Sequence, residues 1–151
     1  MKNLELIEKL LGFAEVQESA VAESLIANAL EDCVSSFDGF ARETCRVFSN
    51  KSSEPSKAVS LSFQNIEKAR ERVLALFGLD LTAPLSIEQS STLKRAFQKR
   101  HLLAHKMGVI DQGYVDATQD SSASIGRKVP IGASEILEVV SLLRLTSQYL
   151  F

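Results

Sequence analysis

Both histidines of the chain lie close together and next to an arginine, in the segment RHLLAH at residues 100–105. In a helix, His101 and His105 are neighbours on one face, because residues four apart are separated by about one turn. The guanidinium of Arg100 stays charged at every physiological pH, whereas an imidazole titrates near neutrality. Phosphodiester cleavage requires such a combination: one group binds the phosphate and another moves a proton. The alternative for each histidine alone is an ordinary imidazole at the edge of the core or at the surface.

Arg100 occupies a position where a helix would bury an apolar side chain. At about 100° per residue, it falls near the centre of an apolar stripe that comprises Leu93, Ala96, Phe97, Ala104 and Met107. An unpaired guanidinium is very costly to bury. We therefore expect Arg100 to meet a carboxylate, to face a subunit interface, or to line a polar site that binds an anion. The candidate carboxylates on the long preceding helix are Asp32, Asp38 and Glu43.

Positive charge is concentrated around the same segment. Residues 89–110 contain five cations and no acid, while the whole chain carries −2, so the remaining residues carry −7. The local field steers a charged ligand more than the net charge does, so this window favours a polyanion. A solvated helix face is the alternative. The cations of the window are Lys94, Arg95, Lys99, Arg100 and Lys106.

Apolar residues recur with helical spacing along almost the whole chain, and two-residue alternation is nearly absent. The pattern predicts an all-α fold, an up-and-down helical bundle of four to five helices with a long loop before the last one. Gly39 is expected to bend or break the long second helix, and Gly78 to close the third. Ser86 and Gln89 are expected to begin the fourth helix as a capping box. The expected helices cover residues 3–13, 22–48, 59–77, 87–107 and 134–150, with a loop at 49–56.

The long loop covers residues 108–132 and is the least regular part of the chain. It contains four glycines, one proline and a polar run at residues 118–122. A connection of this length inside a compact domain is commonly functional or mobile. Its candidate ligand contacts are Tyr114, Arg127 and Lys128. The alternative is a surface loop that contacts no ligand.

Length and composition indicate one domain over residues 1–151, since 151 residues with 45% apolar content suffice for one core. The N-terminus has no targeting pattern and no stretch is long enough to cross a bilayer, so we expect a cytoplasmic protein. Cys33 and Cys45 are twelve residues apart on one expected helix. That separation is a rise of roughly 18 Å, too long for a disulfide, so both are expected in the core.

A metal site is the less favoured use of the two histidines. Their H-x-x-x-H spacing suits zinc on a helix, but the glutamate that follows the first histidine in metalloproteases is missing. Lys99, Arg100 and Lys106 would also repel a cation. We therefore expect neither a metal nor another cofactor.

The run at residues 97–111, FQKRHLLAHKMGVID, with Tyr114 just after it, resembles the signature helix of HEPN domains, the higher eukaryotes and prokaryotes nucleotide-binding family. That family comprises small helical bundles marked by arginine, a polar residue, three variable residues and histidine. Many members are metal-independent endoribonucleases of toxin, antiviral or RNA-processing systems. Arg100, His101 and His105 match the motif position for position.

The resemblance implies a homodimer in which both motifs face one cleft. His105 would assist attack of the RNA 2′-hydroxyl on the adjacent phosphate or protonate the leaving oxygen. Arg100 would stabilise the phosphorane, and His101 would orient or hydrogen-bond the phosphate or its partner motif. Products would carry a cyclic phosphate and DNA would not be cut. The other implied partners are RNA and an antitoxin or neighbouring regulatory protein. The alternative is an inactive HEPN-like module that binds a partner protein or a nucleotide. The expected RNA contacts are Lys94, Arg95, Lys99, Lys106, Tyr114, Arg127 and Lys128.

Overall fold

The computed structural model describes residues 2–14 and 19–150, and within them the regular structure is helical. The described residues contain no strand, and the only pairing of that kind is an isolated antiparallel bridge between Val109 and Lys128. The all-α prediction is therefore confirmed. No described helix is long and apolar enough to cross a membrane. The elements are α1 (Lys2–Ala14), α2 (Ser19–Val47), η1 (Ser49–Lys51), α3 (Pro55–Ala58), α4 (Ile66–Phe77), α5 (Ile87–Lys106), α6 (Gln112–Thr118) and α7 (Ala133–Leu150).

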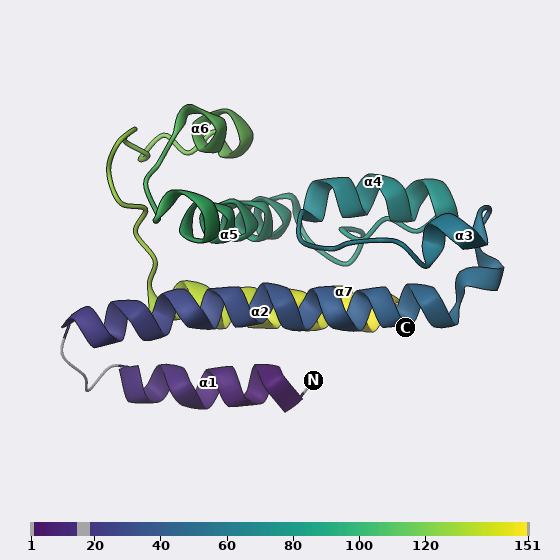
Figure 1. Ribbon diagram of the computed structural model, residues 1–151, viewed down its shortest axis with the longest axis horizontal. Coiled ribbons are helices and arrows are strands. Elements are labelled where there is room, and N and C mark those ends of the chain that lie inside the picture. Colours follow the sequence, from purple (N-terminus) through teal and green to yellow (C-terminus); the bar gives the residue numbers. More distant parts are fainter. Residues whose placement is uncertain (1, 15–18, 151) are drawn as a thin grey trace.

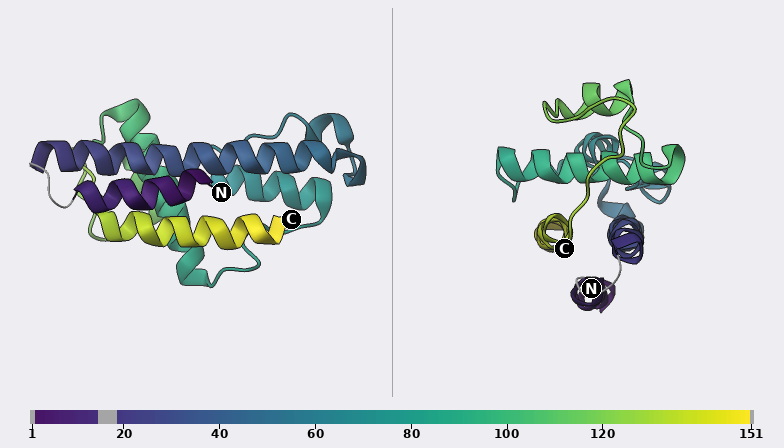
Figure 2. Two further views of the ribbon diagram at one scale, coloured as in Figure 1. Left: turned by 90° about the horizontal axis from the view of Figure 1, so that it is seen from below. Right: turned by 90° about the vertical axis from the view of Figure 1, so that its left-hand side faces the viewer.

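The helices form a bundle built in layers (Figure 1). Helices α1, α2 and α7 lie side by side with roughly parallel axes, and α1 runs opposite to α2 and α7. Helices α4 and α5 cover the face of α2 and α7 that is turned away from α1. Helix α5 crosses α2 and α7 steeply, and α6 packs on its outer side (Figure 2). The expected helical bundle is confirmed, and the steep crossing carries the C-terminal end of α5 past α2. The RHLLAH segment lies at that end.

Aromatic packing fixes where α5 crosses α2. Phe37 of α2 meets Phe97 of α5 edge to face, with ring centroids 6.4 Å apart, and it meets Phe63 in the same way at 5.8 Å. Such contacts add to the stabilisation that burial itself provides. Gly39 was expected to bend or break α2, and the helix continues through it as one element, so it does not break there. The buried neighbours Phe37 and Ala41 hold this part of α2 in the core, which offsets a glycine cost of about 1 kcal/mol.

The two cysteines lie where the sequence predicts, buried on α2 and unpaired. Burial raises the pKa of the Cys33 thiol to about 12 and that of the Cys45 thiol to about 11. Both thiols are therefore neutral near physiological pH, as expected for core residues.

Helix α4 begins at Ile66, seven residues later than the spacing of apolar residues predicts. Asn65 caps it by accepting a hydrogen bond from the Lys68 backbone N–H at 3.1 Å. The preceding segment is non-helical because Asp38 of α2 holds it: its carboxylate accepts from the Phe63 backbone N–H at 2.5 Å and from Gln64 Nε2 at 3.1 Å. Phe63 is thus buried although its segment is not helical. Its spacing from the apolar residues of α4 therefore looks helical in the sequence without marking a helix.

Two stretches expected as loops contain short helices. The expected loop at residues 49–56 includes η1 and the start of α3, and the long connection before α7 includes α6. Asp111 caps α6 by accepting from the Tyr114 backbone N–H at 2.9 Å. A seven-residue helix offers too few turns for an apolar period to show, which explains why the sequence pattern missed it.

Candidate functional site

Helix α5 begins and ends as its sequence predicts, which places the RHLLAH segment in its last two turns. The capping box is present: Gln89 N–H donates to Ser86 Oγ at 3.1 Å, and Ser86 N–H donates to Gln89 Oε1 at 2.9 Å. The helix ends because Met107 adopts a left-handed conformation with φ 52°, followed by Gly108 at φ 76°. The chain therefore turns away immediately after the second histidine.

His101 and His105 lie next to each other, and both side chains are exposed. Their ring centroids are 4.8 Å apart and the rings are inclined by 53°. An imidazole can accept or donate a proton with either nitrogen, so two adjacent rings can serve one reacting group. Within residues 2–14 and 19–150, no group of three or more histidine, cysteine or acidic side chains is placed to hold a metal ion.

Arg100 is mostly buried and is paired within the same chain. Its side chain is 14% exposed, and Nε and Nη2 donate to the two carboxylate oxygens of Glu31 at 3.0 and 2.6 Å. Of the three environments expected for this arginine, the structure shows the carboxylate. The partner is Glu31, and the hydrogen bonds leave the N–H groups of Nη1 outside the pair.

The three carboxylates that the sequence suggested for Arg100 were the wrong ones. Asp38 holds the segment before α4, Glu43 pairs with Arg46 at 2.5 Å, and Asp32 is exposed. Glu31 was missed because it lies about 160° around α2 from Cys33, outside the apolar stripe used to orient that helix. It lies at the edge of a wider buried arc, since α1, α5 and α7 all pack on α2.

Lys99 points into the protein, which corrects its expected role in RNA binding. Its side chain is 7% exposed, and Nζ donates to the Pro130 carbonyl and to Glu135 Oε2, both at 2.8 Å. The amine therefore ties α5 to the start of α7. A contact with RNA needs accessible atoms, and this lysine has almost none.

Tyr114 is the second corrected RNA contact, since it is only 2% exposed. Its hydroxyl donates to Asp120 Oδ2 at 3.1 Å. Burial, followed by the nearby Asp120 charge, raises the pKa of Tyr114 above its ordinary value. The side chain packs with Leu102 and Ile110 in a small satellite core between α5 and α6, so its role is structural.

Two further cations of α5 are partly engaged. Lys94 forms an ion pair of 2.7 Å with Glu67 of α4. Arg95 is half-buried, and its Nε atom is buried without a hydrogen-bond partner. Its positive charge acts to lower the pKa values of Tyr114 and Asp120, which places it on the α6 side of the helix. Neither residue points as freely into solvent as the sequence suggested.

Backbone hydrogen bonds bring the long connection back to the end of α5. Ile110 N–H donates to the Arg127 carbonyl at 2.9 Å, and Gly126 N–H donates to the Ile110 carbonyl at 2.8 Å. Lys128 Nζ donates to the Met107 carbonyl at the helix terminus. Arg127 and Lys128 are exposed, and a cation near these carbonyls also complements the helix dipole.

The structure thus places the exposed histidines His101 and His105 beside each other at the end of α5, where Lys106 is also exposed. Lys128 reaches the same helix end but lies with Leu103 and Met107, on the face about 160° around α5 from the histidines. Comparisons of the chain with protein-family models, curated proteins and solved structures found no match. What these residues can do is therefore argued from their own chemistry: proton transfer between paired imidazoles, at a helix end whose exposed cations attract an anion.

Proposed function

We propose that the chain is a metal-independent endoribonuclease of the HEPN type, which acts as a homodimer in a toxin or antiviral defence system. One observation carries the proposal: the ring centroids of His101 and His105 lie 4.8 Å apart on an exposed surface at the end of α5. Histidines that stabilise a core are buried and hydrogen-bonded, whereas these two are open to a ligand. The basic end of the long connection adds the charge that RNA requires.

The reaction needs no oxidant, metal or cofactor. The RNA 2′-oxygen attacks the adjacent phosphorus while an imidazole accepts the 2′-hydroxyl proton, and the bond from phosphorus to the 5′-oxygen breaks as that oxygen is protonated. His105 carries the proton transfer, and His101 hydrogen-bonds the phosphate. The products are a 2′,3′-cyclic phosphate and a 5′-hydroxyl. DNA lacks the attacking hydroxyl and is not a substrate.

Arg100 is the proposed electrostatic group. Glu31 occupies one edge of its guanidinium, at Nε and Nη2, and the N–H groups of Nη1 remain for a phosphate oxygen. A guanidinium held in a fixed orientation loses little freedom when it stabilises a phosphorane. The pair with Glu31 therefore suits a prepositioned arginine that meets the phosphate with its Nη1 edge.

A second copy of the chain completes the proposed site. In one copy, both imidazoles face water, which weakens electrostatic stabilisation of a transition state. Two copies that meet at the ends of their α5 helices would exclude water and place both motifs on one substrate. The proposed RNA contacts of each copy are Lys94, Arg95, Lys106, Arg127 and Lys128. An antitoxin or neighbouring protein would silence the enzyme, and the proposed location is the cytoplasm.

The test is cleavage of a mixed RNA pool by the full chain in excess EDTA, with the 3′ ends analysed. We expect cyclic phosphate ends for the wild type and loss of activity in Arg100→Ala and His105→Ala. Lys106→Ala should weaken RNA binding and leave the fold unchanged. The matched control is Lys68→Ala, which removes an exposed lysine of α4 and should leave RNA binding unchanged. Activity that requires an added metal, or that survives in His105→Ala, would overturn the proposal.

The second candidate is an inactive binding or scaffold module. It is favoured by the pair between Arg100 and Glu31, which satisfies the guanidinium without any substrate. In that case, the well-folded protein cleaves no RNA, and His105→Ala leaves its binding to RNA, nucleotide or partner protein unchanged. Arg100→Ala would then act only by lowering the free energy of unfolding.

A further inference from the structure

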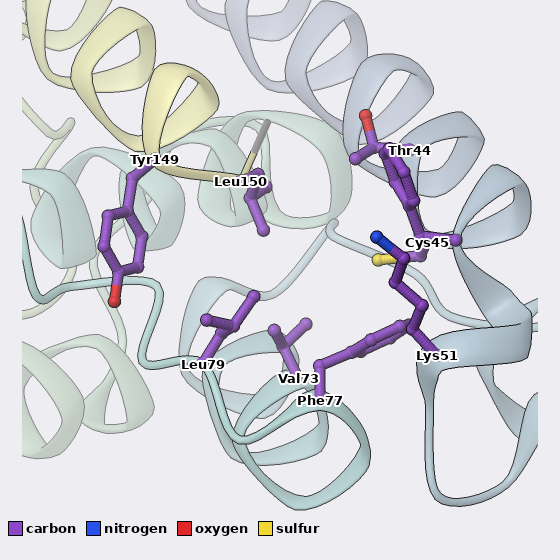
Figure 3. A pocket seen from close by; sticks show the side chains of 9 residues that line it. Thr44, Cys45, Lys51, Val73, Phe77, Leu79, Tyr149 and Leu150 are labelled. Carbon is purple, nitrogen blue, oxygen red and sulfur yellow. The ribbon is translucent and has the colours of Figure 1, made fainter.

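A pocket lies between the C-terminal ends of α2, α4 and α7, and its lining includes no residue of α5 (Figure 3). Its volume is about 280 Å³. Apolar side chains form most of the wall, including Val73, Phe77, Leu79 and Leu150. Pockets that hold small molecules are typically apolar with a few polar groups that fix orientation, and this pocket has that composition.

One cation lies at one side of the pocket. Lys51 Nζ sits over the Phe48 ring, 5.0 Å from its centroid. Figure 3 shows the amine on the same side as Thr44 and Cys45, with Tyr149 on the opposite side. None of the ion pairs among the described residues involves Lys51.

The thiol beside this amine does not supply a negative charge. Cys45 is buried, and burial raises its pKa to about 11, so the sulfur stays protonated near neutral pH. A neutral thiol is also a poor nucleophile. A ligand of this pocket is therefore held without a covalent bond, and its charge complements Lys51 alone.

We propose that this pocket binds a small anionic amphiphile, a monocarboxylate with an apolar body of about eight carbons. The carboxylate pairs with Lys51, and the hydrocarbon lies along Phe77 and Leu79 toward the Tyr149 ring. The volume of about 280 Å³ is close to the lower end of the range of ligand pockets, which suits a small ligand of roughly ten non-hydrogen atoms. The site is separate from the proposed ribonuclease site and does not depend on it.

The test is titration of the full chain with octanoate and with octanol, followed by calorimetry and by NMR of the methyl groups. Octanoate should bind more tightly than octanol by about fivefold, which is the scale of one partly screened charge pair. Lys51→Met should remove that preference, while Lys68→Met, on the exposed face of α4, should keep it. Leu79→Trp should abolish binding by filling the pocket, while Leu74→Trp, which does not line it, should not.

Circular dichroism of each variant checks that it folds, and a second readout checks that octanoate occupies the pocket. Octanoate should slow the reaction of Cys45 with a small thiol reagent and leave that of Cys33, which does not line the pocket, unchanged. Equal binding of octanoate and octanol, unchanged preference in folded Lys51→Met, or no binding up to the solubility limit would each overturn the proposal. A loss of self-association in Leu79→Trp would also overturn it, because the occupant would then be a second copy.

Discussion

Removing Glu31 should destabilise the fold through Arg100 alone. Glu31→Gln keeps the size of the side chain and removes the charge, so the guanidinium stays mostly buried beside a neutral amide. Arg100 is 14% exposed and Glu31 is 40% exposed, with two hydrogen bonds between them. The pair is thus more buried than a surface ion pair and less buried than a core one.

The expected magnitude follows from that intermediate burial. Exposed ion pairs contribute about 0.2–1 kcal/mol, whereas breaking a buried pair costs about 3–5 kcal/mol. We expect Glu31→Gln to lower the free energy of unfolding by about 2 kcal/mol. In a double-mutant cycle with Arg100→Met, the coupling should be about 1–2 kcal/mol, and salt should weaken it only modestly.

The assay is urea denaturation followed by circular dichroism, for both single variants and the double variant. The control cycle is the Glu43 and Arg46 pair, which has the same bidentate geometry, at 2.8 and 2.5 Å, but lies fully at the surface. Its coupling should be smaller and should vanish as salt is raised. A coupling for Arg100 no larger than that of the control pair would refute the view that burial gives this contact its strength.

Three further predictions concern the stability of the fold and the ionisation of single side chains. Lys99→Met should lower the free energy of unfolding by about 2 kcal/mol because it removes a buried ion pair, while Lys106→Ala should stay within about 0.5 kcal/mol; thermal unfolding of both variants checks this. Ultraviolet titration should show one tyrosine that ionises above its ordinary pKa, and that component should be missing in Tyr114→Phe; its persistence would contradict the burial argument. The hydrogen bonds from Arg70 lower the pKa of Asp80, so its contribution of about 1 kcal/mol is present at neutral pH and is lost as pH falls below the ordinary value of 3.8. The difference in free energy of unfolding between wild type and Asp80→Asn should therefore shrink in acid. A difference that grows as the pH falls would contradict the lowered pKa of Asp80.

Regular helices were predictable from the sequence because their apolar spacing, caps and stop signals agree. The capping box at Ser86 and the left-handed Gly78 that closes α4 are both where the sequence places them. The start of α4 was not predictable, because Asp38 holds the preceding segment through contacts 25 and 26 residues away. No local pattern records such a partner.

The candidate site shows the same division. The adjacency of His101 and His105 follows from helical geometry alone and is confirmed. The partner of Arg100 lies 69 residues away on α2, and only the crossing angle of two helices decides which acid reaches it. The burial of Lys99 could not be predicted either, since it depends on how the segment before α7 returns to α5.

The most direct test of the central claim compares one RNA with the same sequence carrying a single 2′-deoxy nucleotide at the cleavage position, in excess EDTA. The account predicts that the wild type cleaves only the unmodified RNA, leaves a cyclic phosphate, and loses this activity in His105→Ala. Cleavage of the deoxy-substituted strand, or equal cleavage by His105→Ala, would contradict a 2′-hydroxyl attack assisted by this histidine.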